Sequence, residues 1–215
     1  PGLGTIVLAR FAIVPGAASP GTPVVVGGVS LPHPGETLCG DAWAARAVGD
    51  RVVVMVVDGL GHGALAAAAA GEAVRVFAER AEAPAEQLMA ETHDALRHTR
   101  GAAVGIATIQ VSGGRVGFVG VGNIGGIVQR GAESRSLVSH AGIVGHQTHK
   151  VQEFSYPWSP ECTLVLHSDG LQSRWQLSRY PAIARYHPTI VAASLYRDHA
   201  RGRDDVTVVA ARETP

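Results

Sequence analysis

The sequence predicts an α/β (α+β) protein built from mainly antiparallel sheets. Three observations indicate this fold class: strand-like apolar runs fall into two groups, helix-like stretches lie between the groups, and regular alternation of strand and helix is absent. The 215 residues provide enough chain for one large core but not for two domains of ordinary size. A composition of 46% hydrophobic and 17% charged residues is typical of a folded globular protein.

The first 28 residues are expected to lie outside the main domain. Residues 1–14 contain the strand-like run GLGTIVLARFAIV, and residues 15–28 combine a linker rich in Pro, Gly and Ala with a first strand. Residues 29–215 then form the main domain. Because the chain starts at Pro1 and not at Met, we expect it to begin inside a longer gene product.

Three strands and two helices are predicted next. The last two of these strands form a hairpin through a tight turn at Gly49-Asp50. The second of them contains VVVMVV, a continuous apolar run that is typical of a strand buried on both faces. Ala64 to Glu82 is predicted as a helix whose many alanines let it lie close to a sheet. Pro84 to Thr99 is predicted as a second helix, with Pro84 near its first turn.

Strands return after Arg100-Gly101, and the chain closes with one more helix and strand. The helix is expected from His187 to His199, and the last strand is VTVVAARE. A loop rich in Gly and His precedes VQEFSY. The other strand runs of this half are AVGIATIQV, RVGFVGVGN, GIVQR, SLVSH, VQEFSY and TLVLHSDG.

The charge pattern and the cysteines exclude several classes of protein. Lys and Arg balance Asp and Glu at 18 each, and Lys150 is the single lysine, so no basic field for nucleic acid is expected. Cys39 and Cys162 follow no secretory signal, and we interpret them as reduced, buried thiols of a cytoplasmic protein. Asp58 and Arg75 interrupt the apolar stretches before the roughly 18 residues that a membrane span needs.

Four aspartates share one position relative to the predicted strands. Asp58 and Asp169 follow strands directly, whereas Asp41 and Asp204 (the latter through Asp205) precede strands. In an antiparallel sheet the end of one strand lies beside the beginning of its neighbour, so all four side chains are expected at one edge. The alternative is ordinary turn chemistry, since aspartate is common in turns. That alternative leaves the pattern common to all four unexplained.

Carboxylates gathered without interleaved lysine or arginine repel one another, and their pKa values rise. Divalent cations relieve this conflict, and ligation by oxygen alone selects Mg²⁺ or Mn²⁺. Two such ions, roughly 3.5 to 4 Å apart, would share and activate a water molecule and offset the charge of a phosphoryl group in transfer. The residues themselves therefore predict metal-assisted hydrolysis of a phosphoester.

Five motifs in a fixed order carry a family resemblance. They are GDAW at Gly40, VVDGLGHG at Val56, VGNIGGIV at Val121, LHSDGL at Leu166 and GRDDVTVV at Gly202. Together they resemble the SpoIIE-type branch of the metal-dependent Ser/Thr phosphatases, the protein phosphatase 2C or PPM superfamily. Within that branch the short RsbX-type stressosome phosphatases are the most similar group. The resemblance spans about residues 29–213.

The resemblance implies a four-layer αββα sandwich with a two-metal site between its sheets. By this resemblance Asp58 would bridge two ions, Mn²⁺ or Mg²⁺, and Gly59 would offer its backbone carbonyl. One ion would also bind Asp41 through water. The other would bind Asp169 and Asp204, and Asp205 is the second choice for the role of Asp204. Gly40 stands where eukaryotic relatives carry an acidic residue, and their phosphate-binding arginine has no evident counterpart here.

His62 within DGLGHG is a second catalytic candidate beside Asp58. It either orients a metal-bound water or the phosphate, or caps the helix that follows, and the sequence leaves both roles open. The run GVGNIG at 120–125 matches a dinucleotide fingerprint, but no helix pattern follows, so we interpret it as a tight turn between strands, with Asn123 hydrogen-bonding near the metal edge.

Three other histidines form a loose cluster in sequence: His140, His146 and His149. Because no cysteine or carboxylate lies close to them, a solvated loop is favoured over a zinc site. In the resembling family this loop borders the active-site face, so a contact with substrate stays open.

The leading hypothesis is a protein phosphoserine and phosphothreonine phosphatase in a bacterial stress-signalling switch. The resemblance implies phosphorylated STAS-domain proteins as substrates. Two alternatives stay open: a phosphatase-like module that docks on a stressosome or sigma-factor regulator without turnover, and a hydrolase of small phosphoesters. Residues 1–14 resemble the closing strand of a GHKL-type serine-kinase domain, which implies a fused or cognate kinase.

Overall fold

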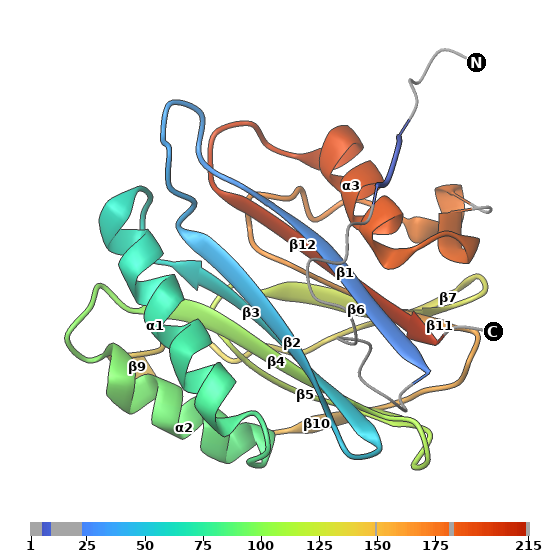
Figure 1. Cartoon of the computed structure of the whole chain (residues 1–215), viewed down its shortest axis with the longest axis horizontal. Coiled ribbons are helices and arrows are strands. Elements are labelled where there is room, and N and C mark those ends of the chain that lie inside the picture. Colours follow the sequence, from blue (N-terminus) through green and yellow to red (C-terminus); the bar gives the residue numbers. More distant parts are fainter. Residues whose placement is uncertain (1–5, 10–22, 149, 181–182, 214–215) are drawn as a thin grey trace.

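Two five-stranded antiparallel sheets pack face to face, and helices cover their outer faces (Figure 1). The structure is a computed structural model that describes residues 6–9, 23–148, 150–180 and 183–213. The first sheet has the order β1-β12-β11-β6-β7 and the second has the order β10-β5-β4-β3-β2. The predicted four-layer αββα sandwich of mainly antiparallel sheets is confirmed.

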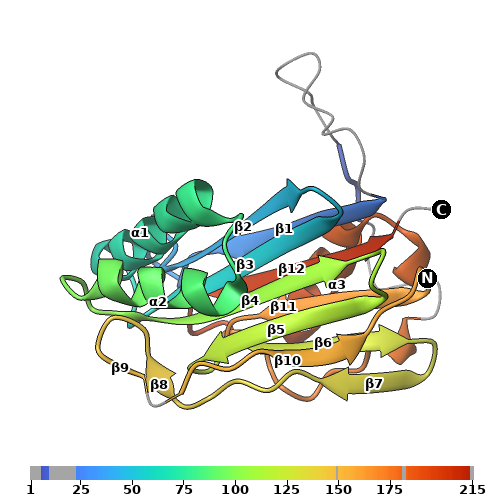
Figure 2. The ribbon, with the colours of Figure 1, turned by 90° about the horizontal axis from the view of Figure 1, so that it is seen from below.

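The described residues form the following strands and helices. The first sheet contains β1 (Val24–Leu31), β6 (Gly125–Arg130), β7 (Glu133–Ser136), β11 (Cys162–His167) and β12 (Val206–Glu213). The second contains β2 (Asp41–Val48), β3 (Arg51–Gly59), β4 (Ala102–Gln110), β5 (Arg115–Val121) and β10 (Phe154–Pro157). A separate hairpin pairs β8 (Gly142–Ile143) with β9 (Gln147–Thr148), and Figure 2 shows it beside α2. The helices are α1 (Ala64–Arg80), α2 (Ala85–Leu96), α3 (Pro188–His199) and the 3₁₀ turns Leu177–Arg179 and Ile183–Arg185.

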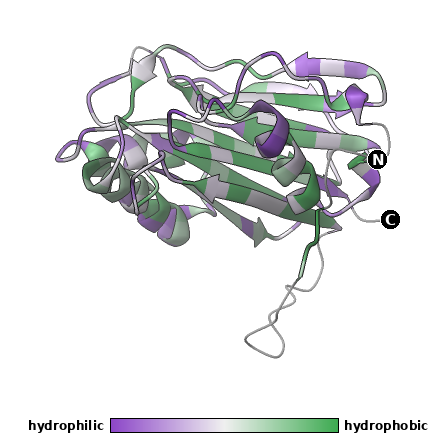
Figure 3. Cartoon of the chain, turned by 90° about the horizontal axis from the view of Figure 1, so that it is seen from above, coloured by the Kyte–Doolittle hydropathy of each residue, from purple (hydrophilic) through white to green (hydrophobic). Residues whose placement is uncertain are grey.

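Strand β3 is buried on both faces, which explains its continuous apolar run. Its alternate side chains point in opposite directions. One set packs against α1 and α2, and it consists of Val53, Met55 and Val57. The other set packs against the first sheet, and it consists of Val52, Val54 and Val56. Figure 3 shows hydrophobic residues along the strands at the centre of the molecule.

The outer helices bury one face each. Four alanines of α1 are fully or almost fully buried, and their small side chains let the helix lie close to the second sheet: Ala66, Ala69, Ala70 and Ala73. On the other side, Val191 and Leu195 of α3 pack in one core cluster with Val208 of β12. Among the described residues, no helix combines the length and the apolar character needed to cross a membrane.

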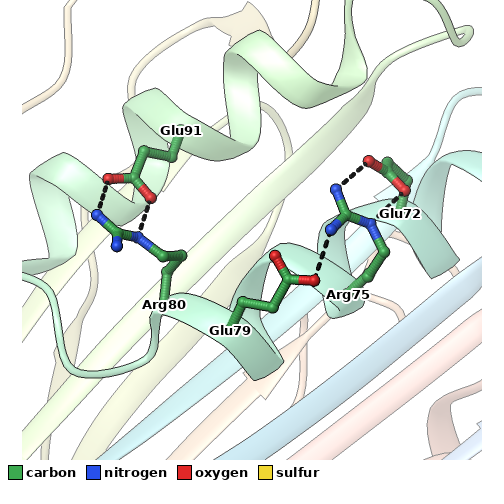
Figure 4. A network of polar contacts seen from close by, with 5 residues as sticks. All are labelled: Glu72, Arg75, Glu79, Arg80 and Glu91. Atoms are coloured by element: carbon green, nitrogen blue, oxygen red, sulfur yellow. Dashed lines mark hydrogen bonds and ion pairs between the residues drawn. The ribbon is translucent and has the colours of Figure 1, made fainter.

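Arginine and glutamate side chains link the exposed surfaces of α1 and α2 (Figure 4). Arg75 of α1 bonds both Glu72 and Glu79, with the shortest N to O distances at 2.7 Å. Arg80 holds Glu91 of α2 through two bonds of 2.6 and 2.7 Å. Because these side chains are largely exposed, each ion pair contributes little free energy, and apolar packing does most to dock the helices.

Both predicted helices of this pair end earlier than expected. The first ends at Arg80 and not at Glu82, and the Ala83 N–H donates to the Arg80 carbonyl at 2.9 Å in the turn that leads to Pro84. Pro84 itself has an extended ψ of 145° and caps α2, so the second helix starts one residue later than predicted. It ends at Leu96, where the hydroxyl of Thr99 donates to the Leu96 carbonyl at 2.7 Å.

The strand predicted over SLVSH is wrong in position. The chain turns back immediately after β6 at Gly131, whose φ of 55° suits a tight turn, and pairs as β7 over Glu133–Ser136. All four residues of β7 are exposed, so no apolar alternation marks this edge strand in the sequence. The loop rich in Gly and His also contains the β8 and β9 hairpin, which was not predicted.

The strand predicted within residues 1–14 lies largely outside the described residues, and residues 6–9 form no strand. The boundary expected between residues 28 and 29 falls inside β1, and all eight residues of β1 pair with β12. The sheet therefore includes the chain from Val24 onward. The resemblance of residues 1–14 to part of a kinase domain stays a prediction.

Candidate metal centre

Asp41 and Asp58 face each other across the β2 and β3 hairpin. Asp41 begins β2, Asp58 is the penultimate residue of β3, and the two are direct register partners. Opposed residues of antiparallel strands project their side chains from the same face. On this face Trp43 and Val56 point toward the other sheet, so both carboxylates lie at the edge between the two sheets. Asp41 is only 5% exposed.

The first sheet brings Asp169 and Asp204 to this same edge. Asp169 lies two residues after β11 and Asp204 two residues before β12, and these strands are antiparallel neighbours. Figure 1 shows the beginning of β12 near the beginning of β2 and the end of β3. Asp58, Asp169 and Asp204 line one cavity of about 460 Å³ together with Asn123. The structure thus brings together all four carboxylates that share the strand-end pattern.

Burial and repulsion between neighbouring carboxylates raise the pKa values of Asp41, Asp58 and Asp204. Burial raises the pKa of Asp58 to about 8, and the charges of three neighbours add to the shift. These neighbours are Asp41, Asp169 and Asp204. Burial raises the pKa of Asp41 to about 7, with further contributions from the charges of Asp205 and Asp204. Burial and the charge of Asp169 also raise the pKa of Asp204.

Two polar side chains hold the carboxylates in place. The Ser168 hydroxyl donates to Asp41 Oδ2 at 2.6 Å and accepts the Thr207 backbone N–H at 2.9 Å. Sequence reasoning missed Ser168, although it directly precedes Asp169 in LHSDGL. Asn123 donates from Nδ2 to Asp169 Oδ2 at 2.7 Å, so the predicted bond of this residue at the metal edge is confirmed.

Asp205 lies deeper than Asp204 and does not line the cavity. It is 3% exposed, and its Oδ1 accepts the His33 backbone N–H at 2.8 Å. Its Oδ2 is buried and has no hydrogen-bond partner among the described residues. A Cβ at Gly40 would lie 2.6 Å from this oxygen, so glycine there leaves room beside a second buried carboxylate.

At Gly59 the backbone of β3 lies against the backbone of α1. A Cβ at this position would lie 2.3 Å from the backbone oxygen of Ala66, so no other residue fits without moving the helix. The Gly59 N–H donates to the Gly40 carbonyl at 3.1 Å, which ties the residue before Asp41 to the residue after Asp58. Gly61 follows in the left-handed region with a φ of 86°.

His62 lies beside the cavity and not in its lining. Its Nδ1 is 2.9 Å from Glu36 Oε1, and its ring stacks on His33 with centroids 4.5 Å apart. The alternative in which His62 caps α1 is wrong, because the N-cap residue of α1 is Gly63 and the helix has no side-chain cap hydrogen bond. Sequence reasoning missed Glu36 and His33, which reach this place through the long loop between β1 and β2.

The other candidate signals have structural explanations. The run 120–125 ends β5 and passes to β6 in the other sheet, so no dinucleotide helix follows it. The ring of His140 packs against Phe154, and His146 Nε2 is 3.1 Å from the Thr99 carbonyl oxygen. His149 lies outside the described residues. No zinc cluster forms among the histidines that the structure describes.

The cysteines differ in burial. Cys162 is buried, as predicted, but Cys39 is only half-buried, because the loop that holds it leads along the surface into β2. Both thiols are free. Burial nevertheless raises the pKa of Cys39 to about 12, and the nearby charges of Asp41 and Asp205 add to this, so it is a poor nucleophile.

The residues of this edge fit hard divalent cations. Their donors are oxygens, burial and like charge raise the pKa values of Asp41 and Asp58, and Asp205 Oδ2 is buried without a partner among the described residues. Over the described ranges, no three His, Cys, Asp or Glu side chains close tightly enough to enclose an ion by themselves. Mg²⁺ and Mn²⁺ sites accommodate this, because such ions keep several waters beside one or two carboxylates.

Comparison with known proteins gives a consistent result. Residues 48–213 match the family model of Stage II sporulation protein E (SpoIIE). Phosphoserine phosphatase RsbX of Bacillus subtilis (strain 168) is 24% identical over 138 residues, which cover 64% of this chain and 69% of RsbX. The crystal structure of RsbX in complex with magnesium has a TM-score of 0.77 at 20% identity, covering 89% of this chain and 96% of that one.

Two further solved structures share the fold. One comes from a structure of the bacterial stressosome, described as a modular system adapted to control secondary messenger signaling. It has a TM-score of 0.82 at 26% identity, and the match covers 88% of this chain and 99% of the stressosome chain. The other is the catalytic domain of the serine threonine protein phosphatase PstP in complex with two manganese ions. It has a TM-score of 0.68 at 17% identity, and the match covers 89% of this chain and 99% of the PstP chain. Because the SpoIIE model matches well over half of the sequence, the chain belongs to the SpoIIE family of PP2C-type, metal-dependent Ser/Thr protein phosphatases.

Proposed function

We propose that this chain removes phosphate from phosphoserine or phosphothreonine of a STAS-domain regulator in bacterial stress signalling, and that it uses two divalent cations, Mn²⁺ or Mg²⁺. The observation that carries the proposal is the single cavity onto which Asp58, Asp169 and Asp204 converge, with Asp41 directly opposite Asp58. The relatives named for the stressosome and for RsbX support the choice of substrate class.

Each carboxylate has a role in this proposal. Asp58 would be shared by the two ions, Asp41 and the Gly59 carbonyl would help to hold one of them, and Asp169 and Asp204 would help to hold the other. Bound divalent cations lower the pKa of water and offset the charge of a transferring phosphoryl group. Burial raises the pKa of Asp58 to about 8, so this carboxyl would give up a proton on becoming a cation ligand.

The neighbouring polar groups position these ligands. Ser168 fixes the orientation of Asp41, and Asn123 fixes that of Asp169. Such hydrogen bonds to ligating carboxylates normally strengthen metal affinity. Asp205 keeps a supporting role, since its Oδ1 anchors the loop at His33.

His62 is proposed to act at the rim of the cavity. The Glu36 carboxylate accepts from Nδ1–H, so Nε2 is an acceptor in the neutral ring and donates toward the substrate only in the imidazolium form. His62 belongs to the loop that follows Asp58, directly after Gly61. His62→Gln should slow the release of a poor leaving group, such as serine, more than that of an aryl alcohol.

The test compares phosphate release from a phosphorylated STAS-domain protein and from an aryl phosphate, with and without Mn²⁺. The proposal expects Mn²⁺-dependent release and a higher kcat/KM for the protein. Equal or better turnover of the aryl phosphate would indicate a hydrolase of small phosphoesters. Absence of release together with absence of Mn²⁺ binding in calorimetry would indicate a docking module without turnover.

A further inference from the structure

A second hollow continues the carboxylate cavity across the loop that follows Asp58. Leu60, Gly61 and Ile143 line both spaces, so the two are continuous. The second hollow has a volume of about 710 Å³. We call it the Arg100 groove, and its lining consists of Leu60, Gly61, Thr99, Arg100, Ile143 and His146.

Arg100 supplies a positive charge to this groove. It is exposed, and its guanidinium makes no hydrogen bond or ion pair with any part of the chain that the structure describes. The guanidinium lies close to the chain at Gly61, because a Cβ there would be 3.1 Å from Arg100 Nη1. Arg75 and Arg80, in contrast, are neutralised by glutamates on the helix surface.

The backbone around Arg100 is fixed to the site loop. The Leu60 N–H donates to the Gly101 carbonyl at 3.0 Å, and the Gly101 N–H donates to Thr99 Oγ1 at 3.0 Å. A Cβ at Gly101 would lie 2.6 Å from the Ile143 side chain, so the β8 and β9 hairpin packs directly on this segment. The backbone at Arg100 is therefore fixed relative to the cavity.

We propose that the Arg100 groove binds the polypeptide on one side of the phosphorylated residue, and that Arg100 pairs there with an acidic side chain of the substrate. This inference rests on the proposed phosphatase function. The phosphate belongs in the carboxylate cavity, and Arg100 does not line that cavity, so Arg100 meets a second group of the substrate.

The chemistry of the groove fits an acidic peptide segment. Leu60 is 49% exposed and Ile143 is half-buried, and together they offer an apolar surface to the stem of a glutamate or to a neighbouring side chain. Arg100 gives this surface a positive charge with which an acidic side chain can pair. A small phosphoester would leave the groove unused, whereas a phosphoprotein would fill it.

The experiment uses a series of phosphoserine peptides with alanine at the flanking positions. One glutamate is placed in turn at each of the three positions on either side, and a matching series carries lysine. With Mn²⁺, kcat/KM is measured for the whole chain on the alanine peptide, the best glutamate peptide and its lysine counterpart. Two ratios are compared: glutamate to alanine and glutamate to lysine. An exposed ion pair limits the expected gain from the glutamate to about fivefold over the alanine peptide.

Variants at Arg100 separate charge recognition from general effects. Arg100→Ala should bring the glutamate to alanine ratio to about one, and Arg100→Glu should reverse the preference toward lysine. Arg97→Ala is the matched control, because Arg97 is exposed three residues earlier and pairs only with Asp94 on α2 among the described residues. This control should keep both kcat/KM ratios of the unmodified protein.

The outcomes distinguish the groove from the function. Release of phosphate from all peptides at equal kcat/KM, or an unchanged ratio in Arg100→Glu, would overturn the groove alone. A loss of kcat/KM in Arg100→Ala that is equal for every peptide would assign Arg100 to the phosphate and would also overturn it. If the unmodified chain releases no phosphate from any peptide or from an aryl phosphate, the proposed function fails, and the groove proposal fails with it.

Discussion

Asp41 and Asp58 are direct cross-strand partners at the open end of the β2 and β3 hairpin, with both side chains on the face between the two sheets. Like charges directly opposite each other destabilise an antiparallel pair. Burial of both groups increases this penalty. A hairpin that keeps this pair has a local instability that a bound cation would relieve, and two predictions, one on stability and one on ion binding, follow from it.

Without divalent cations, the free energy of unfolding should fall as pH rises from about 4 to about 8. The pKa values of Asp41 and Asp58 are raised from 3.8 to about 7 and about 8 in the folded chain. In this interval the folded state binds more protons than the unfolded state, so stability is greatest below the unfolded pKa and is lost toward the folded pKa. Urea unfolding in EDTA at a series of pH values measures this.

Asp58→Asn serves as the reference for that series, because it removes the titrating group and keeps the shape. With rising pH, the free energy of unfolding of the unmodified chain should fall relative to that of Asp58→Asn. A rise relative to Asp58→Asn would mean that the folded state favours the charged form of Asp58.

Binding of Mn²⁺ at neutral pH should release protons. Asp58, with a pKa of about 8, is mostly protonated at pH 7 and has to lose its proton to become a ligand. Calorimetric titrations at pH 7 in buffers of different ionisation enthalpy should therefore give different apparent enthalpies. This buffer dependence should shrink at pH 9, where the carboxyl is already ionised, and equal dependence at both pH values would argue against the raised pKa.

Asn123→Ala should weaken Mn²⁺ affinity by about tenfold, since it removes the hydrogen bond that orients a ligating carboxylate. Gln87→Ala is the matched control, because Gln87 also donates from a side-chain amide to a carboxylate, that of Glu91 on the exposed surface of α2. The control should bind Mn²⁺ as the unmodified chain does. Similar Mn²⁺ affinity in both variants would remove Asn123 from the metal centre.

Alanine at two glycines should change stability in opposite directions. Gly59→Ala forces a Cβ against the Ala66 backbone oxygen, and we expect a loss of about 1 to 3 kcal/mol. Gly71→Ala places a methyl group in open space on α1, and we expect a gain of about 0.5 to 1 kcal/mol from helix propensity. Chemical denaturation measures both, and a stable Gly59→Ala protein would contradict the close contact of β3 with α1.

The sequence predicts well those features that repeat along a single strand or helix. The apolar run of β3 predicts a buried strand because side chains on both of its faces pack into a core. The strand-end positions of Asp41, Asp58 and Asp169 predict a common edge because the end of one antiparallel strand lies beside the beginning of its neighbour. The alanines of α1 likewise predict its close packing.

Features that depend on contacts between distant segments are not visible in the sequence. Ser168 reaches Asp41 across 127 residues, and His33 reaches Asp205 across 172. The choice of Asp204 for the cavity, with Asp205 buried behind it, depends on how the segment before β12 turns. The polar strand β7 lacks an apolar pattern because both of its faces are exposed, so only its pairing with β6 reveals it.

The most direct test of the proposed function is Mn²⁺-dependent phosphate release from a phosphoserine peptide by Asp58→Asn. Asp94→Asn is the matched control, since Asp94 is exposed on α2 and pairs with Arg97. We predict that the unmodified chain and Asp94→Asn release phosphate at the same rate when Mn²⁺ is present, and that Asp58→Asn releases none above the metal-free level. Mn²⁺-dependent release by Asp58→Asn at the rate of the control would contradict the central role of this carboxylate.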